Sequence, residues 1–293
     1  MRGLRAAVRR LAPRLRRLDA LAAALLALYA ALALSTELGA NVAGQGLDPV
    51  WAEARQRGTL RVAIDLGFYP FTWVDEAGQP AGYDVDLARA VAQRLDLGVE
   101  FVPSGLDAIY DDLAARRADM AASALPYAPE QSWRASFSSF YFNAGQVLVA
   151  PAGSPIDGED KLAGRTVAVP LGSDADTHAR RLMAAGTPLT LRAEYDTPEE
   201  ALDAVLRGEA DAAIVDNASA LMALGRRPGL SIAAALTLEP YVLAFAPEAF
   251  ELRERANRAL EDLRREGFFD ELGHKWFVEA EPPAQNTSRE STP

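Results

Sequence analysis

The chain carries the same short pattern twice, at Leu113–Ser123 and at Val205–Asp216. The stretches "LAARRADMAAS" and "VLRGEADAAIVD" both run from a helix end through a tight turn to Ala-Asp, a short apolar segment and a polar residue. Short apolar runs bounded by turn residues are typical of buried strands. The repetition predicts two α/β lobes of like design, and 293 residues are enough for two domains. Ligands of such sheets bind beyond the carboxyl ends of the strands, which makes Ser123 and Asp216 candidate site residues.

The remaining sequence alternates strand and helix patterns around these two stretches. Strands are expected at Thr59–Asp65, Gly98–Pro103, Met120–Ser123, Gln146–Pro151 and Arg165–Pro170. Helices are expected over Asp84–Leu95 with Asp84 as a cap, along the face Leu106, Ile109 and Leu113, from Ser173 or Asp174, from Thr197, and over Pro247–Phe277. The alternation indicates an α/β fold, and it places Asp65 and the loop after Val169 at the same kind of strand end as Ser123.

Composition excludes several classes of site. The chain has no cysteine, so disulfides, thiolate metal sites and a cysteine nucleophile are excluded. Its only histidines, His178 and His274, are far apart in sequence, and we expect neither a metal site nor a cofactor. Seven of the 30 basic residues but only two of the 41 acidic ones lie in residues 1–40, so 23 basic and 39 acidic residues remain and the rest carries a net charge of −16. An acidic body makes nucleic acid a poor partner.

The arginine-rich start precedes an uncharged run from Ala20 to Thr36. The run is long for a signal-peptide core of about 7 to 15 residues and at the short end of a membrane span of about 17 to 25 residues. We therefore interpret residues 1–40 as an arginine-rich region with an uncleaved anchor helix, with a cleaved signal as the alternative, and residues 41–57 as a linker. Both interpretations leave the arginines in the cytoplasm and place the body in the periplasm or on the outer face of the cytoplasmic membrane.

A dozen motifs in order make the chain resemble a known family. The order "LRVAID…YPF…GYDVDLARAVAQRL…ADMAAS…PEQ…GQVLVAPAGSPI…LAGRTVAVPLGS…LRGEADAAIVD…LRREGFFDELGHKWF" is similar to the bacterial extracellular solute-binding proteins of family 3, over roughly Gly58 to Phe277. The resemblance implies a two-lobed periplasmic-binding-protein fold of type II. It also implies that the protein is a monomer and delivers its ligand to the permease of an ABC importer. Residues 58–149 and 238–278 would form lobe 1 and residues 150–237 lobe 2, with hinges near Val149–Ala152 and Ala233–Leu238. Residues 279–293 are polar and proline-rich, and we expect them to be disordered.

The resemblance also assigns ligand contacts residue by residue. Phe68 in "GFYPFTW" would stack on the ligand, Leu106 would flank its other side, and Asp216 would hold its ammonium group. Each polar candidate has a plainer alternative: Asp65 as a turn carboxylate, Ser123 as a local backbone partner, and Asp216 as the cap of the next helix. Phe71 and Trp73, in the same aromatic stretch as Phe68, are expected in the core.

Two positions depart from the family pattern. Gln131 in "APEQ" stands where the family has an arginine that clamps the ligand's α-carboxylate. The helix start at Ser173 and Asp174 reads "GSD" in place of "GTT", and an aspartate there would repel an anion unless it only caps the helix. Arg134 could replace the missing arginine only if its loop were rebuilt.

Three functions are compatible with these features. The main prediction is an extracytoplasmic protein that captures a small, polar, amino-acid-like solute. The charge pattern predicts a cationic or neutral polar solute, such as an amine or a quaternary ammonium compound, and not an ordinary free α-amino acid. A tethered ligand sensor is the first alternative, although the chain has only an arginine-rich segment before the anchor. A cyclohexadienyl dehydratase-like enzyme is the second, with Asp65, Asp174, Asp216 or His178 as acid or base, but its substrates carry carboxylates and the clamp is missing.

Overall fold

The computed structural model describes residues 48–280. The predicted anchor, the beginning of the linker and most of the predicted tail lie outside the described residues. Within residues 48–280, no helix combines the length and apolar character that a membrane crossing requires.

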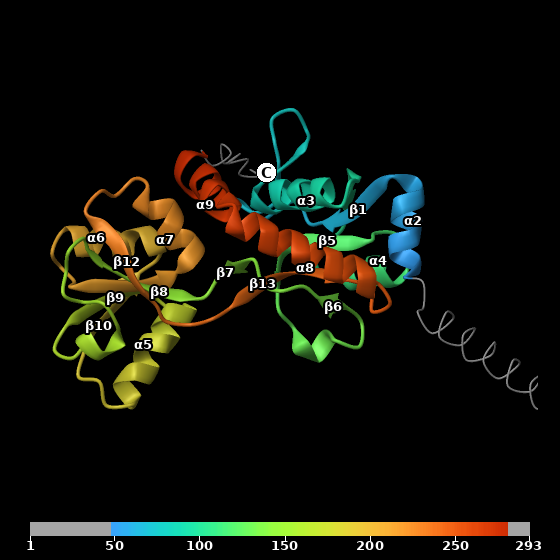
Figure 1. The fold of residues 1–293 in the computed structure, drawn as a ribbon. Coiled ribbons are helices and arrows are strands. Elements are labelled where there is room, and N and C mark those ends of the chain that lie inside the picture. The colour runs from blue at the N-terminus through green and yellow to red at the C-terminus, as the bar shows by residue number, and fades with distance from the viewer. Residues whose placement is uncertain (1–47, 281–293) are drawn as a thin grey trace, which may run out of the picture. The chain divides into compact units, whose positions relative to one another are not determined.

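The first lobe is built on a six-stranded sheet in the order β4-β1-β5-β13-β6, with β7 also paired to β13 (Figure 1). Its strands are β1 (Thr59–Ile64), β4 (Gly98–Pro103), β5 (Met120–Pro126), β6 (Ser136–Phe137), β7 (Phe142–Asn143) and β13 (Pro240–Phe245), and β2 (Trp73–Val74) and β3 (Pro80–Ala81) form a separate hairpin. Its helices are α2 (Pro49–Arg57), α3 (Tyr83–Arg94), α4 (Ile109–Ala114), the 3₁₀ turn η1 (Pro129–Gln131), α8 (Phe250–Arg265), α9 (Phe268–Gly273) and the π-helix η3 (His274–Glu279). β1, β4 and β5 are parallel, whereas β13 is antiparallel to β5.

The second lobe is built on a five-stranded sheet in the order β10-β9-β11-β8-β12. Its strands are β8 (Gln146–Pro151), β9 (Thr166–Pro170), β10 (Thr190–Tyr195), β11 (Ala212–Asp216) and β12 (Leu230–Ala235), and its helices are the 3₁₀ turn η2 (Glu159–Lys161), α5 (Asp174–Ala184), α6 (Pro198–Leu206) and α7 (Asn217–Leu224). The parallel strands β9, β10 and β11 are joined through α5 and α6, as the alternating pattern predicted.

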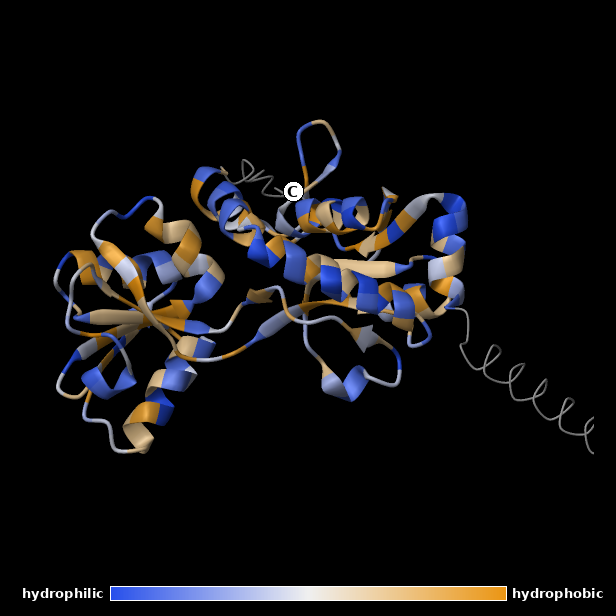
Figure 2. Cartoon of the chain, viewed as in Figure 1, coloured by the Kyte–Doolittle hydropathy of each residue, from blue (hydrophilic) through white to orange (hydrophobic). Residues whose placement is uncertain are grey.

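Each sheet is buried by the helices around it. In Figure 2 most strands are predominantly orange, whereas α8 carries much blue. Phe71, Leu87, Phe245 and Leu260 belong to the core of the first lobe and are at most 1% exposed. Two apolar clusters pack around the second sheet. One includes Leu202 and the other includes Ile214.

The chain passes twice between the sheets (Figure 1). β7 pairs with β13 in the first sheet and β8 pairs with β11 and β12 in the second, so the first crossing lies at residues 144–145. This is earlier than Val149–Ala152, because β8 pairs along its whole length within the second sheet. The second crossing lies at residues 236–239, between β12 and β13, and overlaps the predicted hinge.

Several local predictions were wrong. Asp84 does not cap a helix: α3 begins at Tyr83 after Gly82, and the Asp84 carboxylate is fully buried. Leu106 precedes α4 and is 52% exposed, because that helix begins only at Ile109. The C-terminal helix is interrupted at Gly267, whose φ of 82° is left-handed, and η3 extends it to Glu279, inside the predicted tail.

The start of the described chain is more ordered than a linker. Asp48 caps α2 by accepting a hydrogen bond from the Trp51 amide at 2.9 Å and also accepts one from the Leu252 amide at 2.9 Å. Val50, Trp51 and Ala54 are buried, so α2 joins the core of the first lobe.

In the second lobe the cap prediction for Thr197 was confirmed, and α5 is capped by Ser173 and not by Asp174, which is the first residue of the helix. Ser173 precedes α5 and its hydroxyl accepts a hydrogen bond from the Asp176 amide at 3.2 Å. Thr197 caps α6 through the Glu200 amide, also at 3.2 Å. The Glu200 carboxylate reaches back to the Asp196 amide at 2.9 Å, one residue before the position that a capping box predicts.

Candidate ligand site

Three predicted site residues of the first lobe are joined by hydrogen bonds. Asp65 follows β1 directly, and its amide donates to the Ser123 hydroxyl in β5 at 2.9 Å. The Asp65 carboxylate accepts from the Leu106 amide at 3.1 Å. The local roles that were the alternatives for Asp65 and Ser123 are therefore present. The other carboxylate oxygen of Asp65 and the hydroxyl hydrogen of Ser123 are left for other partners, so these bonds do not decide between structure and ligand contact.

A buried carboxylate whose role the sequence analysis missed supports β5 next to Ser123. Asp84 is 0% exposed and accepts hydrogen bonds from the Ala124 amide and, at 2.9 Å, from the Tyr141 hydroxyl. Ala124 has a φ of 47°, a left-handed conformation that an alanine adopts only when its surroundings hold it there. Burial raises the pKa of Asp84 to about 7, while the two hydrogen bonds act in the opposite direction.

The aromatic loop divides into an exposed and a buried part. Phe68 is 48% exposed, and its ring stacks on Phe71 with centroids 5.5 Å apart and planes 14° apart. Phe71 is 1% exposed and Trp73 packs partly buried against the same core, as predicted. One face of Phe68 is therefore supported by the core, and its exposed remainder is free to contact a ligand.

The predicted residues of the second lobe line one hollow. Its volume is about 240 Å³, and its walls are Gln146, Pro170, Ser173, Asp174, Ala175, Pro198, Val215 and Asp216. Asp174 is exposed in the first turn of α5, and the Asp216 carboxylate accepts a hydrogen bond from the Ser219 amide at 2.9 Å, which caps α7. The capping alternative for Asp216 is thus realised through one oxygen, and its other oxygen has no hydrogen bond within residues 48–280.

Tyr241 is an aromatic residue near the second crossing that the sequence analysis also missed. It belongs to β13, just after the second crossing, and its ring meets Phe71 edge-on with centroids 5.3 Å apart. Burial is the main cause that raises the pKa of Tyr241 to about 12, and nearby carboxylates, which include Asp84 and Asp216, act in the same direction. Its hydroxyl therefore stays protonated at neutral pH.

Gln131 and Arg134 differ sharply in how they are engaged. The Gln131 Oε1 atom is buried and has no hydrogen-bond partner within the described part of the chain. Arg134 is ion-paired to Asp111, and its guanidinium lies 5.5 Å from the ring centres of both Tyr110 and Trp133. Arg134 is therefore already engaged by Asp111 and by two aromatic rings.

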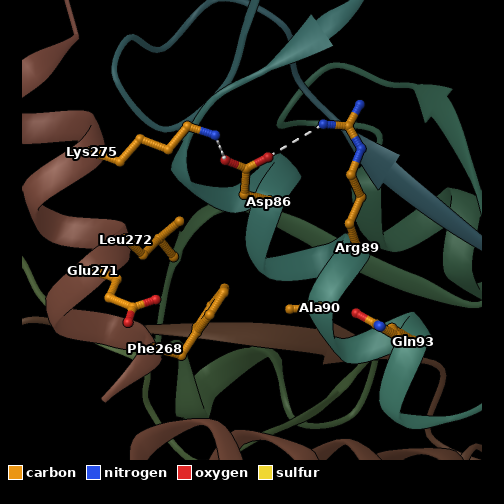
Figure 3. Close-up of a pocket in the computed structure, with 8 residues that line it drawn as sticks. All are labelled: Asp86, Arg89, Ala90, Gln93, Phe268, Glu271, Leu272 and Lys275. Carbon is orange, nitrogen blue, oxygen red and sulfur yellow. Dashed lines mark hydrogen bonds and ion pairs between the residues drawn. The ribbon is translucent and has the colours of Figure 1, made fainter. Parts of the chain in front are cut away.

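A larger hollow lies elsewhere, between α3 and α9 (Figure 3). It measures about 360 Å³ and is lined by Asp86, Arg89, Ala90, Gln93, Phe268, Glu271, Leu272 and Lys275. Asp86 accepts hydrogen bonds from Lys275 Nζ at 2.6 Å and Trp276 Nε1 at 2.9 Å, and pairs with Arg89 at 3.3 Å. The charges in this hollow largely neutralise one another, and none of the predicted site residues lines it.

Residues 48–280 contain no cluster of three or more histidine, aspartate or glutamate side chains arranged to hold a metal ion. The site candidates thus form two groups, Asp65 with Ser123 and Leu106 in one lobe and Ser173 with Asp174 and Asp216 in the other. Ser123 does not end its strand as predicted, because β5 continues to Pro126. Two α/β lobes joined by two crossing segments define a periplasmic-binding-protein fold of type II. Residues 60–279 match the family described as bacterial extracellular solute-binding proteins, family 3, and the chain belongs to that family.

The relatives of the chain are solute-binding proteins of ABC transporters. A "Probable amino-acid ABC transporter-binding protein" of Haemophilus influenzae is 30% identical over 223 residues, which are 75% of this chain and 84% of the relative. The lysine/arginine/ornithine-binding periplasmic protein of Escherichia coli is 28% identical over 75% of this chain and 87% of its own. The protein is therefore a solute-binding protein of the kind that serves ABC transporters, and its family is extracytoplasmic.

Solved structures that share the fold include both a solute receptor and an enzyme. The L-cystine solute receptor of Neisseria gonorrhoeae, in its unliganded open conformation, is 27% identical, with a TM-score of 0.67 over 75% of this chain and 93% of that one. An ancestral cyclohexadienyl dehydratase is 26% identical, also with a TM-score of 0.67, over 78% of this chain and 95% of that one. The fold therefore serves both binding and catalysis, and the side chains of the site have to decide between them.

Proposed function

We propose that the protein captures a small cationic solute of the amine or quaternary ammonium type between its lobes and delivers it to the permease of an ABC importer. The observation that carries this proposal is the hollow of about 240 Å³ in the second lobe, which two carboxylates line and no basic residue does. Carboxylates that share a site repel one another unless a cation neutralises them. A cationic ligand supplies that neutralisation.

Two further observations support a cation. Gln131 leaves a buried acceptor, and a buried acceptor costs about 1 to 3 kcal/mol until a donor satisfies it. A primary ammonium group has N–H donors for such an acceptor, whereas a quaternary ammonium nitrogen and a carboxylate have none. Phe68 presents an exposed ring, and a cation over such a ring gains about 0.5 to 2 kcal/mol.

A cationic amino acid is the second candidate. It is favoured by the lysine/arginine/ornithine-binding relative, whose ligands combine a cationic side chain with an α-carboxylate. In this chain the α-carboxylate would be held by neutral donors, such as the side-chain amide of Gln131 or the amides at the start of α5.

Isothermal titration of the full-length chain separates the two candidates. Choline, putrescine, L-arginine and L-glutamine are titrated in turn into the native protein and into Asp216→Asn. The proposal expects choline or putrescine to bind tightly. Asp216→Asn should weaken the binding of putrescine by tenfold or more, since a hydrogen bond to a charged group contributes about 1.5 to 3 kcal/mol. It should also weaken the binding of choline, because the opposite charge is lost. Tight binding of L-glutamine with no response to choline or putrescine would overturn it. L-arginine binding alone would favour the second candidate.

The oligomeric state, the location and the absence of catalysis are further parts of the same proposal. We infer a monomer that is held at the outer face of the cytoplasmic membrane by its N-terminal helix and has no catalytic activity. The missing carboxylate clamp supports binding over the dehydratase alternative, because prephenate-type substrates carry carboxylates. Incubation of the purified chain with prephenate and arogenate tests this, and turnover of either would make the protein an enzyme. Protein sequencing of material recovered from membranes tests the anchor, since a mature N-terminus near Asn41 would identify a cleaved signal.

A further inference from the structure

The two crossing segments are joined by one asparagine side chain. Asn143 lies at the end of β7, and its Nδ2 donates to the carbonyl of Thr237 in the second crossing at 3.1 Å. Its Oδ1 accepts from the amide of Gly145 at 3.0 Å and from the amide of Glu239 at 2.8 Å. All three bonds require this orientation of the amide, because a flipped side chain would place its NH₂ group against two N–H donors.

The segments are also packed tightly at this point. A Cβ atom on Gly145 would lie 2.4 Å from the carbonyl oxygen of Thr237, so any side chain there would force the segments apart. The Gln146 amide donates to the Thr237 hydroxyl at 2.7 Å, and the Leu236 amide donates to the Gln146 carbonyl at 2.8 Å. The two segments therefore form one hydrogen-bonded ribbon that Asn143 spans.

A second asparagine connects this ribbon to the candidate ligand site. Asn217 directly follows Asp216, and its Nδ2 donates to the Asn143 carbonyl at 2.7 Å. Its amide donates to the Gly145 carbonyl at 3.0 Å. The end of β11, which carries Asp216, is thus tied to the crossing by two bonds from one residue.

We propose that Asn143 is a positioning residue for solute capture, which clasps the two crossing segments so that they turn as a single hinge and, through Asn217, holds the Asp216 strand end to that hinge. Two independent strands would let the lobes twist as well as close. A clasped pair leaves mainly the closing motion, in which Asp216 keeps its place relative to the hinge. Asn143 itself need not touch the solute.

The test measures the lobes of the ligand-free, full-length chain and does not depend on the identity of the solute. The chain has no native cysteine, so Gln56→Cys in α2 and Ala184→Cys in α5, both at exposed positions, accept spin labels cleanly. The distance distribution between the labels is compared in the native background, in Asn143→Asp and in Asn143→Leu. Asn143→Asp keeps the two accepted bonds and loses the donated one, whereas Asn143→Leu loses all three.

The proposal expects the distribution to widen in the order native, Asn143→Asp, Asn143→Leu. Exchange of the Gly145 and Glu239 amides with solvent should accelerate in Asn143→Leu by about fivefold, the factor that corresponds to one net hydrogen bond. Asn257→Leu is the matched control, because Asn257 accepts a single amide bond from Ser139 within the first lobe, at 2.8 Å. It should lower the melting temperature without widening the distribution.

If Asn143→Leu widens the distribution no more than Asn257→Leu does, Asn143 is only a structural residue and the proposal fails. Gly145→Ala covers the case in which Asn143→Leu does not fold, since it separates the segments while it keeps Asn143. An unchanged distribution in folded Gly145→Ala would overturn the proposal equally. Neither result depends on whether the solute is a cation.

Discussion

Asp119 and Asp211 make the same contact in the two lobes. The Asp119 carboxylate accepts from the Arg61 amide in β1 at 2.8 Å, and its own amide donates to the Arg61 carbonyl at 2.8 Å. Asp211 makes both bonds with Thr166 in β9, also at 2.8 Å. Each aspartate therefore lies at the start of a strand that carries a candidate site residue, Ser123 within β5 in one lobe and Asp216 at the end of β11 in the other.

The two aspartates should differ in their contribution to stability. Asp119 is 1% exposed and pairs with Arg57 and Arg61, whereas the Asp211 side chain is 40% exposed and lies 3.7 Å from Arg165. We expect Asp119→Asn to lower the free energy of unfolding by about 2 to 4 kcal/mol, less than the loss for a fully buried pair because both arginines are partly exposed.

Asp211→Asn, the matched variant, should cost about 1 kcal/mol or less, since surface ion pairs contribute little. Urea unfolding of the two variants under the same conditions checks the difference. Equal losses would mean that the shared backbone bonds dominate and that the arginines around Asp119 add nothing.

Phe68 and Phe71 stack on one another but should have different roles, Phe68 in binding and Phe71 in stability. Phe71→Ala removes a ring that is 1% exposed and should cost about 3 to 5 kcal/mol of unfolding free energy. Phe68→Ala removes a ring that is 48% exposed and should cost about 1 kcal/mol or less. Solute affinity should instead fall by about 2- to 30-fold in Phe68→Ala, the range of a cation over an aromatic face. Denaturation and titration of both variants check this, and a Phe68→Ala protein with native affinity would remove Phe68 from the site.

The features that the sequence predicted correctly are those set by neighbours in the chain. The strands β1, β4, β8 and β9, and the caps Ser173 and Thr197, depend on apolar periodicity and on groups within three or four residues. The family pattern added the fold, because the order of many short motifs constrains the topology more than any one of them does.

The features that the sequence could not predict depend on contacts between distant residues. Asp84 has the sequence context of a helix cap, yet its partners Ala124 and Tyr141 lie 40 and 57 residues away. Asn143 bonds to Thr237 across 94 residues. The point at which the chain leaves the first sheet was also misplaced, because the alternation within Gln146–Pro151 does not reveal which sheet the strand joins.

The buried carboxylate of Asp84 should make stability depend on pH. Its pKa is about 7 in the folded protein against 3.8 in the unfolded chain, so the folded state binds more protons between these values. The stabilising contribution is therefore complete below about pH 4 and is lost as the pH rises toward 7 and beyond. The native protein should lose up to a few kcal/mol relative to Asp84→Asn, which cannot ionise, between pH 5 and pH 8.

Urea unfolding at several pH values measures this difference. Asp270→Asn is the control, because Asp270 is exposed and its removal should leave the pH dependence of the native protein unchanged. Parallel curves for the native protein and Asp84→Asn across the whole range would show that Asp84 does not titrate there.

The specificity of the site should respond to the residue that replaces the clamp. Gln131→Arg places a guanidinium at the position of the buried, unpartnered Oε1 atom, where it could bind a carboxylate through two parallel hydrogen bonds. We expect L-arginine and L-glutamine to gain at least tenfold in affinity relative to choline and putrescine, because each hydrogen bond to a charged group contributes about 1.5 to 3 kcal/mol.

Arg134→Gln is the matched control. Arg134 is held by Asp111 and two aromatic rings, so its loss should leave the preference among these solutes unchanged while it lowers stability modestly. Titration of both variants with the same four solutes decides the matter. A loss of amino-acid binding in Arg134→Gln, with no gain in Gln131→Arg, would identify Arg134 as the carboxylate partner and contradict the cation-selective site.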